Sequence, residues 1–524
     1  MQKSDTDARQ GPARRRTVAI LSVIAAVALG LRLAYVDPGV HLTGDAVEYL
    51  RYGMDAARQG ALPADWTPQN NGFPAFMSLF FSGDLHSNML AQRLATVSLS
   101  AVTVAPIYSI ARRFLPAWPA LIAPVIFAVE PQIAWTAQMG LLEAPFALLV
   151  TSALACFLSG DRRVALLAFP LLSIATLVRG EGNIVLITFF IFYAVRFRRY
   201  RRTVPELLLA LFVVALILAP MMSYRTEING TDSIFDRTLL LAEQRFSGIA
   251  GAGIQADADA AAQPGASWEP RPNTLLMLGE LVLLPVMLLV PYGLYRTFKM
   301  EARHATVSML FLLMIVISIA VMSYGWFISR YLFWMVPLSC VLATFAVWRL
   351  SCCHRRRDLA ALAVTGVIVA SSAALLEERP DYGPTTEWYG INGMVLEAVG
   401  GGALTLQETR PLLYPLFLDG DGLPARAEAA PGHSSHRWQC GYPDSDCSDT
   451  PGRMDVAVHA FRASNYTHIV VDGSEERRSH LLIDAFNDPG SYPYLTKVYD
   501  STHHGFSYRV KVFEIDHRLL PPRP

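Results

Sequence analysis

Long apolar segments alternate with polar ones from residue 17 to residue 376. A membrane-spanning helix needs about 20 apolar residues, and somewhat fewer where polar residues flank it. On this criterion the chain has about eleven spans, which predicts a polytopic α-helical membrane protein. The predicted spans are residues 17–36, 88–110, 117–135, 141–158, 164–178, 183–196, 204–222, 274–295, 305–324, 331–348 and 359–376.

Arginine clusters between the predicted spans indicate how the chain is oriented. Positively charged residues prefer the cytoplasmic side of a membrane. With the N-terminus inside, every cluster falls on that side. The clusters are Arg14–Arg16, Arg112–Arg113, Arg162–Arg163, Arg196–Arg202, Arg296–Arg303 and Arg349–Arg357. The extracytoplasmic side then carries two long loops, residues 37–87 and 223–273, and the first span is retained because it lacks a clear small-residue cleavage site.

The pattern changes after residue 376, where the long apolar segments end. Runs rich in β-branched and aromatic residues predict strands, and helical patterns alternate with them. The predicted strands are residues 403–407, 468–471, 494–499 and 508–515, and a helix is predicted over residues 387–399. We therefore expect two domains: a transmembrane domain over residues 1–376 and a soluble extracytoplasmic α/β domain over residues 377–524.

Composition narrows the class of protein further. Hydrophobic residues make up 52% of the 524 positions and charged residues only 17%, which is too apolar for an ordinary soluble enzyme. The formal net charge is zero, so no global basic field favours nucleic acid as a partner.

Carboxylates beside the membrane boundary are the first candidates for chemistry. Asp45 and Glu48 lie in the first outer loop and open an amphipathic helical pattern. Their structural interpretation is a helix cap closed by a capping-box-like pair, and a capped carboxylate is also a rigid one. Glu143 begins the fourth span, where the helix dipole stabilises a negative charge. The functional interpretation is that ionisable groups at membrane depth face a cavity.

Arg179 and Arg330 lie at the outer ends of spans, against the general trend of the basic residues. Arg179 follows the fifth span with Glu181 beside it, and Arg330 opens the tenth span with Tyr331. The structural interpretation of Arg179 is a local pair with Glu181. For Arg330 it is anchoring at the membrane interface with Tyr331 and Trp334. The functional interpretation is an anion clamp, because a guanidinium group matches phosphate in a forked geometry.

The order and spacing of these motifs resemble the GT-C membrane glycosyltransferases, which include the polyprenyl-phosphate-sugar-dependent protein mannosyltransferases and the aminoarabinose lipid A transferases. The chain departs from the protein mannosyltransferases by a single Asp45 in place of an Asp-Glu pair, and by Asn70-Asn71 in place of prolines. A motif of the WWDYG type is also missing. The resemblance rests on Gly44–Tyr49, Asn71–Phe76, Gln92–Leu94, Glu143–Pro145, Arg179–Gly182, and Arg330–Leu332 with Pro337.

The resemblance implies a GT-C-like fold and transfer of one sugar, with inversion, from a polyprenyl-phosphate donor. The acceptor is a lipid, a glycan or a protein on the extracytoplasmic face. Asp45 is expected to act as the base, and Glu143 to orient the acceptor or bind a divalent cation together with Asp45. Arg330 is the first choice for the lipid phosphate and Arg179 the second. Tyr331 and Glu48 complete the expected substrate-binding set.

Two other classes of protein stay open at this point. A transporter or flippase of a lipid-linked glycan predicts charges within the spans and broken helices in paired halves. A non-catalytic membrane scaffold would need no carboxylates in a membrane-facing loop.

Overall fold

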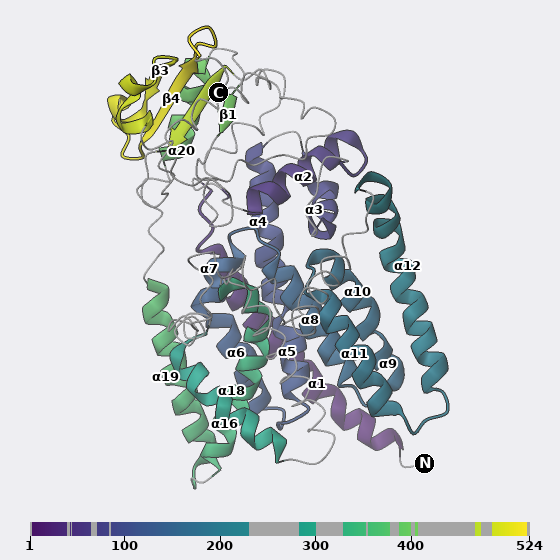
Figure 1. Ribbon diagram of the computed structural model, residues 1–524. Helices are drawn as coiled ribbons and strands as arrows, with labels where there is room; N and C mark the ends of the chain where they lie inside the picture. Colours follow the sequence, from purple (N-terminus) through teal and green to yellow (C-terminus); the bar gives the residue numbers. More distant parts are fainter. Residues whose placement is uncertain are drawn as a thin grey trace, which may run out of the picture. The chain divides into compact units, whose positions relative to one another are not determined.

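The computed structural model is an assembly of helices with a small sheet near the C-terminus (Figure 1). It describes residues 3–38, 42, 45–63, 71–82, 85–229, 282–299, 329–352, 355–377, 387–399, 404–406, 467–472 and 485–520. The chain divides into two compact units. The first, here the bundle unit, comprises Met1–Val36, Tyr52–Gly83 and Leu90–Pro380. The second, the sheet unit, comprises Asp37–Arg51, Asp84–Met89 and Asp381–Pro524.

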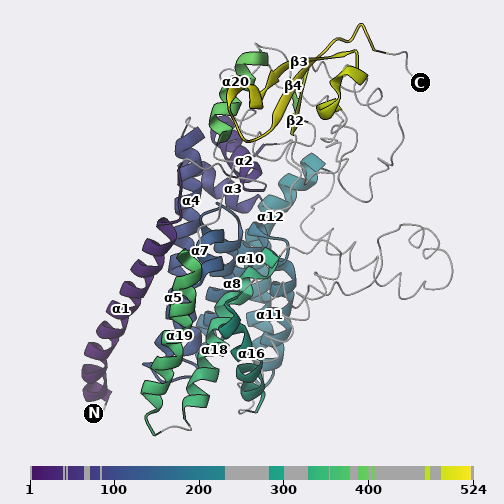
Figure 2. The same ribbon diagram turned by 90° about the vertical axis from the view of Figure 1, so that its left-hand side faces the viewer.

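Helices account for nearly all of the described bundle unit (Figure 1 and Figure 2). Two of them, α2 (Asp45–Gln59) and α4 (Leu85–Val102), begin in residues of the sheet unit. The α-helices that follow are α1 (Lys3–Leu33), α3 (Gly72–Met77), α5 (Val104–Ala111), α6 (Ile122–Val129), α7 (Pro131–Ala137), α8 (Glu143–Phe157), α9 (Arg162–Leu166), α10 (Ala168–Val178), α11 (Gly182–Phe197), α12 (Thr203–Asn229), α16 (Leu284–Phe298), α18 (Val336–Ser351) and α19 (Arg357–Glu377). Short 3-10 helices are η1 (Ser78–Phe80), η2 (Pro119–Leu121) and η3 (Ser329–Met335).

Within the described residues, five helices are long and apolar enough to cross a membrane. They are Arg15–Leu33, Leu85–Ala111, Thr203–Ile228, Leu332–Ser351 and Arg357–Glu377. Each coincides with a predicted span, so the prediction of a polytopic helical protein is confirmed. The other predicted spans correspond to shorter or broken helices in the described residues. The predicted span 274–295 is described only from residue 282, and the span at 305–324 lies outside the described residues.

A bend of 52° divides the predicted span 117–135 into two helical segments, Pro119–Val129 and Pro131–Ala137. Pro131 opens α7, and the residue before a proline is driven out of the α-helical region. Glu130 accordingly has an extended backbone, with φ −64° and ψ 118°. The apolar periodicity of this segment does not reveal the break, but Pro131 with Glu130 before it marks the position.

Helices α8 and α10 pack against each other and against several neighbours in the bundle unit. Helix α8 also packs against α5 and η3, and α10 also packs against α11 and α12. On another side α18 packs against α16, α6 and α19. Helix α18 is buried almost along its whole length, whereas α1 and α12 leave most of their apolar residues uncovered. Apolar side chains exposed on a span are what contact with lipid requires.

The described residues of the sheet unit contain four strands in the order β1-β2-β4-β3. They are β1 (Leu404–Leu406), β2 (His468–Asp472), β3 (Leu495–Asp500) and β4 (Val510–Ile515), which confirms the predicted strand positions. β1 pairs with β2 in parallel, and the other two pairings are antiparallel. Helix α20 (Trp388–Val399) packs on one face, where Ile391 and Val395 join Val470 and Val512 in a buried cluster.

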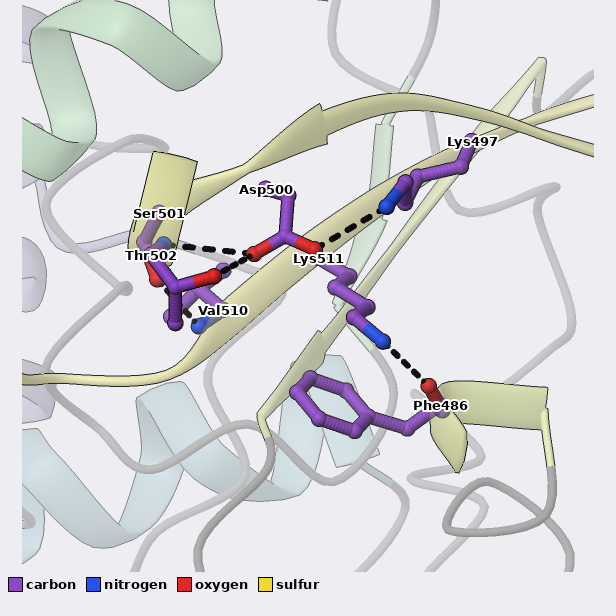
Figure 3. Close-up of polar contacts among 7 residues, drawn as sticks. All are labelled: Phe486, Lys497, Asp500, Ser501, Thr502, Val510 and Lys511. Atoms are coloured by element: carbon purple, nitrogen blue, oxygen red, sulfur yellow. Dashed lines mark hydrogen bonds and ion pairs between the residues drawn. The ribbon is translucent and has the colours of Figure 1, made fainter. Parts of the chain in front are cut away.

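A second buried cluster lies on the opposite face of the sheet, around Phe486 and Phe513. At the end of β3, polar contacts close the turn to β4 (Figure 3). Asp500 accepts hydrogen bonds from the Thr502 hydroxyl at 2.7 Å and from Lys497 at 3.1 Å. The Lys511 ammonium donates to the Phe486 carbonyl at 2.6 Å.

Candidate functional site

Glu143 is the first residue of α8, as the sequence predicts, and its side chain is only 4% exposed. Pro145 follows in the first turn, where its missing N–H costs no helical hydrogen bond. Two contacts hold the loop before Glu143 against α4. Gln92 donates to the Gly140 carbonyl at 2.7 Å, and Thr96 donates to the Ala137 carbonyl at 2.6 Å. The position of this carboxylate is therefore fixed by its helix and by α4.

Arg179 brings two carboxylates together at the end of α10. One terminal nitrogen, Nη1, donates to Glu143 Oε1 at 2.9 Å. The other, Nη2, donates to Glu181 Oε1 at 2.7 Å, and Nε donates to Glu181 Oε2 at 3.3 Å. Arg179 has an extended backbone as the C-cap of α10, and Glu181 is the N-cap of α11. The tight turn between two helices thus aims one guanidinium at both carboxylates, and we call these three residues the Arg179 cluster.

Phe146 links this cluster to the segment that contains Arg330. The Arg179 guanidinium lies 5.8 Å from the centroid of the Phe146 ring. That ring in turn meets Trp334 edge to face, at a centroid distance of 6.4 Å. Trp334 belongs to η3, which also contains Arg330 and Tyr331 and packs against α8. The backbone of η3 therefore lies beside the helix that begins with Glu143, while the side chains of Arg330 and Tyr331 are outside the description.

A second buried polar group forms near the same end of α10. Arg225, near the end of α12, donates to Asn71 Oδ1 at 2.5 Å. The Asn71 amide donates to the Tyr52 hydroxyl at 3.1 Å. Next to Asn71, a Cβ on Gly72 would come within 2.7 Å of the Leu177 carbonyl oxygen, so only glycine allows α3 this close to the end of α10.

Arg225 and Tyr52 are not among the residues predicted from the sequence. A signal for Arg225 was present: it follows the predicted span 204–222 on the side opposite to the arginine clusters, as Arg179 and Arg330 do. Tyr52 gave no such signal, because the helical pattern of α2 does not distinguish it from the other polar positions of that helix.

Asp45 and Glu48 lie in the first turn of α2, as predicted. The helix buries Ala46, Leu50 and Met54, which belong to its predicted apolar stripe. Both carboxylates belong to the sheet unit, whereas the Arg179 cluster belongs to the bundle unit. Their convergence with Glu143 in one pocket stays a prediction.

The described residues contain no group of three or more His, Cys, Asp or Glu side chains suited to holding a metal ion. A divalent cation held by Asp45 and Glu143 stays a prediction, because these two residues belong to different units. The two carboxylates that meet in the Arg179 cluster converge on a guanidinium. We therefore assign no step of the chemistry to a metal.

Comparison with a family model matches residues 73–224 to the dolichyl-phosphate-mannose-protein mannosyltransferase family. That range contains Glu143, Arg179 and Glu181. No curated protein matches the sequence.

Solved structures match nearly the whole chain. The apo oligosaccharyltransferase of Archaeoglobus fulgidus is similar with a TM-score of 0.60 and 14% identity, over 92% of this chain and 73% of that one. The archaeal oligosaccharyltransferase AglB from the same organism, in complex with an inhibitory peptide and a dolichol-phosphate, has a TM-score of 0.61 and 14% identity. That match covers 97% of this chain and 75% of the other. The chain thus has the GT-C fold, as its motifs predict.

Proposed function

We propose that this protein with the GT-C fold is an integral-membrane glycosyltransferase that moves one sugar from a polyprenyl-phosphate donor to an acceptor hydroxyl. The observation that carries the proposal is the Arg179 cluster. Its buried carboxylate, Glu143, begins a helix in the segment that matches the mannosyltransferase family. The dolichol-phosphate bound to the archaeal relative supports a lipid phosphate as the donor.

The reaction needs a base, a grip on the leaving phosphate and a group that orients the acceptor. In our proposal the acceptor oxygen attacks the anomeric carbon from the face opposite to the phosphate, and the bond from that carbon to the phosphate oxygen breaks. The acceptor proton passes to the Asp45 carboxylate. Arg330, with Tyr331, binds the phosphate as negative charge develops on it. Glu48 contributes to the same binding surface from the first turn of α2.

The Arg179 cluster supports a positioning role for Arg179 in place of phosphate binding. Its guanidinium already donates to two carboxylates, so the charges of the three side chains sum to minus one. The net negative charge of the cluster opposes the approach of a phosphate. We therefore assign Arg179 to holding Glu143 in place, and Glu143 to accepting a hydrogen bond from the acceptor.

The proposed orientation follows from the arginine clusters and the positive-inside rule. The N-terminus is cytoplasmic, about eleven spans cross the membrane, and the Arg179 cluster lies at the extracytoplasmic ends of α8 and α10. Residues 1–376 form the transmembrane domain and residues 377–524 a soluble domain on the outer side. The acceptor is a lipid, a glycan or a protein on that side.

The transporter alternative predicts broken helices in corresponding positions of two halves. The described residues contain one bent pair, at Glu130. Next to it, the buried Arg32 donates to the carbonyls of Phe127 and Ala128 at 3.1 Å, so its hydrogen bonds tie α1 to the end of α6. The buried charge of Arg32 therefore has a structural explanation, because it joins two packed helices.

The test is a transfer assay with purified protein and a radiolabelled polyprenyl-phosphate sugar. Wild-type protein is expected to release the sugar from the lipid phosphate, whereas a transporter would leave the donor intact. Asp45→Asn is expected to abolish release while the protein keeps its elution profile in detergent. Arg330→Ala is expected to weaken use of the donor far more than use of the acceptor.

Full activity of Asp45→Asn would remove that residue from the mechanism. Equal effects of Arg330→Ala on both substrates would show that this arginine acts through packing. A matched control is Arg163→Ala, at the other end of the bundle unit.

A further inference from the structure

Arginines gather at the end of the bundle unit away from the Arg179 cluster. Helix α8 begins with Glu143 and runs for 15 residues, about 22 Å, to Phe157. Three connections lie at this far end: the one after α5, the one that leads into α9, and the one between α11 and α12 (Figure 1). Their arginines are Arg112, Arg113, Arg162, Arg163, Arg196, Arg198, Arg199, Arg201 and Arg202.

Two of these arginines hold the connections together. Arg196 donates to the carbonyls of Phe157 and Ser159, the latter at 3.0 Å, and so ties the end of α11 to the end of α8. Arg162 forms an ion pair with Glu206, and its guanidinium lies 4.4 Å from the centroid of the Tyr200 ring. The connection between α11 and α12 is therefore an ordered scaffold.

The other arginines at this end present exposed charge. Arg112, Arg113, Arg163, Arg198, Arg199, Arg201 and Arg202 are exposed. None of these seven forms an ion pair with another residue that the structure describes. The acids nearest in the chain have other roles, since Asp161 caps α9 and Glu206 binds Arg162. Like charges repel at this density, so a bound anion would stabilise them.

A shallow apolar crevice, largely open to the outside, lies between α11 and α12. Its volume is about 350 Å³, and it is lined by Phe190, Ile191, Leu207, Leu208 and Leu211. Leu207 is four residues after Thr203, the first residue of α12, which corresponds to about 6 Å along the helix axis. Tyr200, 55% exposed, lies among the arginines of this segment, and aromatic side chains are enriched at membrane interfaces.

We propose that the crevice and the arginine-rich connection 196–202 form a binding site for an anionic phospholipid. An acyl chain occupies the crevice, and the guanidinium groups of Arg198 to Arg202 bind the phosphate of the headgroup. A free phosphate would satisfy the arginines alone, but it would leave the apolar crevice uncovered. By the positive-inside rule the bound lipid belongs to the cytoplasmic leaflet, on the side opposite to the proposed transfer reaction.

The test measures lipid binding to the full chain in detergent by native mass spectrometry. Dioleoylphosphatidylglycerol is the probe, and dioleoylphosphatidylcholine and glycerol phosphate are the comparison ligands. Arg199→Gln with Arg202→Gln is expected to weaken binding of the anionic lipid roughly 25-fold, from about fivefold for each arginine. The matched control, Arg355→Gln with Arg356→Gln, removes the same charge from the connection before α19 and is expected to change binding less than twofold.

A second variant tests the crevice without changing any charge. Ile191→Trp fills the crevice and is expected to weaken lipid binding severalfold, because the acyl chain loses its packing contacts with the crevice side chains. Unchanged binding in both variants would overturn the proposal. Equal losses of binding in the two arginine pairs would show general charge attraction and contradict the proposal. Equally tight binding of phosphatidylcholine or glycerol phosphate would also contradict the proposal.

Discussion

At the scale of single residues, the guanidinium group of Arg179 is central to the proposed site. Arg179 is 9% exposed and donates to Glu143, at the start of α8, and to Glu181, at the start of α11. The sequence suggested a local pair with Glu181, which is confirmed, but it did not indicate the contact with Glu143. That contact joins residues 36 positions apart, and only the packing of α8 against α10 creates it.

Removing this guanidinium is expected to destabilise the bundle unit. Arg179→Gln leaves Glu143 with a buried charge that has lost its guanidinium partner, which costs about 3 kcal/mol. Glu181→Gln is expected to cost less, about 1 kcal/mol, because that side chain is 25% exposed. Thermal unfolding in detergent measures both. The double variant Arg179→Gln with Glu143→Gln should recover part of the loss, and simple additivity would show that the two side chains do not interact.

At the scale of elements, close packing of helices depends on small residues. A Cβ placed on Gly293 of α16 would lie 2.3 Å from the Leu342 carbonyl of α18. Backbone atoms cannot yield as a flexible side chain does, so the two helices must separate to admit it. Gly366 in α19 has nothing within 4 Å of the same position.

These two glycines form a matched pair for substitution. Gly293→Ala is expected to lower the stability of the bundle unit by about 2 kcal/mol through overpacking. Gly366→Ala is expected to raise it by about 0.5 kcal/mol, because alanine is the better helix former. Thermal unfolding of the full chain measures both variants. A loss from Gly366→Ala as large as that from Gly293→Ala would argue against the α16–α18 contact.

The turn between β3 and β4 makes the sheet unit sensitive to acid. Burial by itself would raise the pKa of Asp500, but hydrogen bonds from Thr502 and Lys497 outweigh it and lower the pKa to about 2 (Figure 3). An aspartate in an unfolded chain has a pKa of about 3.9. Because the folded pKa is depressed, the stabilisation is fully present above pH 4 and is lost as the pH falls towards 2.

Asp500→Asn is expected to remove about 2 kcal/mol of this stabilisation above pH 4 and almost none near pH 2. Pepsin cleavage within residues 485–520 of the full chain, followed from pH 4 to pH 2, measures the difference. Wild-type protein should become more sensitive as the pH falls, whereas the variant is already sensitive at pH 4. The exposed Glu514→Gln is the control, and an acid response that Asp500→Asn leaves unchanged would contradict the assignment.

At the scale of the whole molecule, the proposal needs two differently charged ends. The Arg179 cluster lies at one end of α8, and the arginine-rich connections lie at the other. Sugar transfer from a lipid-linked donor is proposed at the first end, and anionic lipid binding at the second. The positive-inside rule places these activities on opposite sides of the membrane.

Cysteine labelling in intact cells tests this orientation. In a background without the native cysteines, Ser507→Cys in the sheet unit is expected to react with a membrane-impermeant maleimide added from outside. Arg199→Cys is expected to react only after the membrane is opened. Both residues are exposed, so access of the reagent and not burial decides the outcome. Labelling of Arg199→Cys in intact cells would reverse the proposed orientation.

The amino-acid sequence by itself determined the helical membrane class, the places of the five long apolar helices and the strands of the sheet unit. These features depend on apolar length and on alternation, which are properties of local sequence. Local sequence also placed Glu143 and Asp45 at the starts of their helices. Only the tertiary structure decided that Arg179 binds Glu143, that Arg225 reaches Asn71, and that a crevice lies between α11 and α12. Such contacts join segments far apart in the chain, and they depend on how helices pack, which no local pattern specifies.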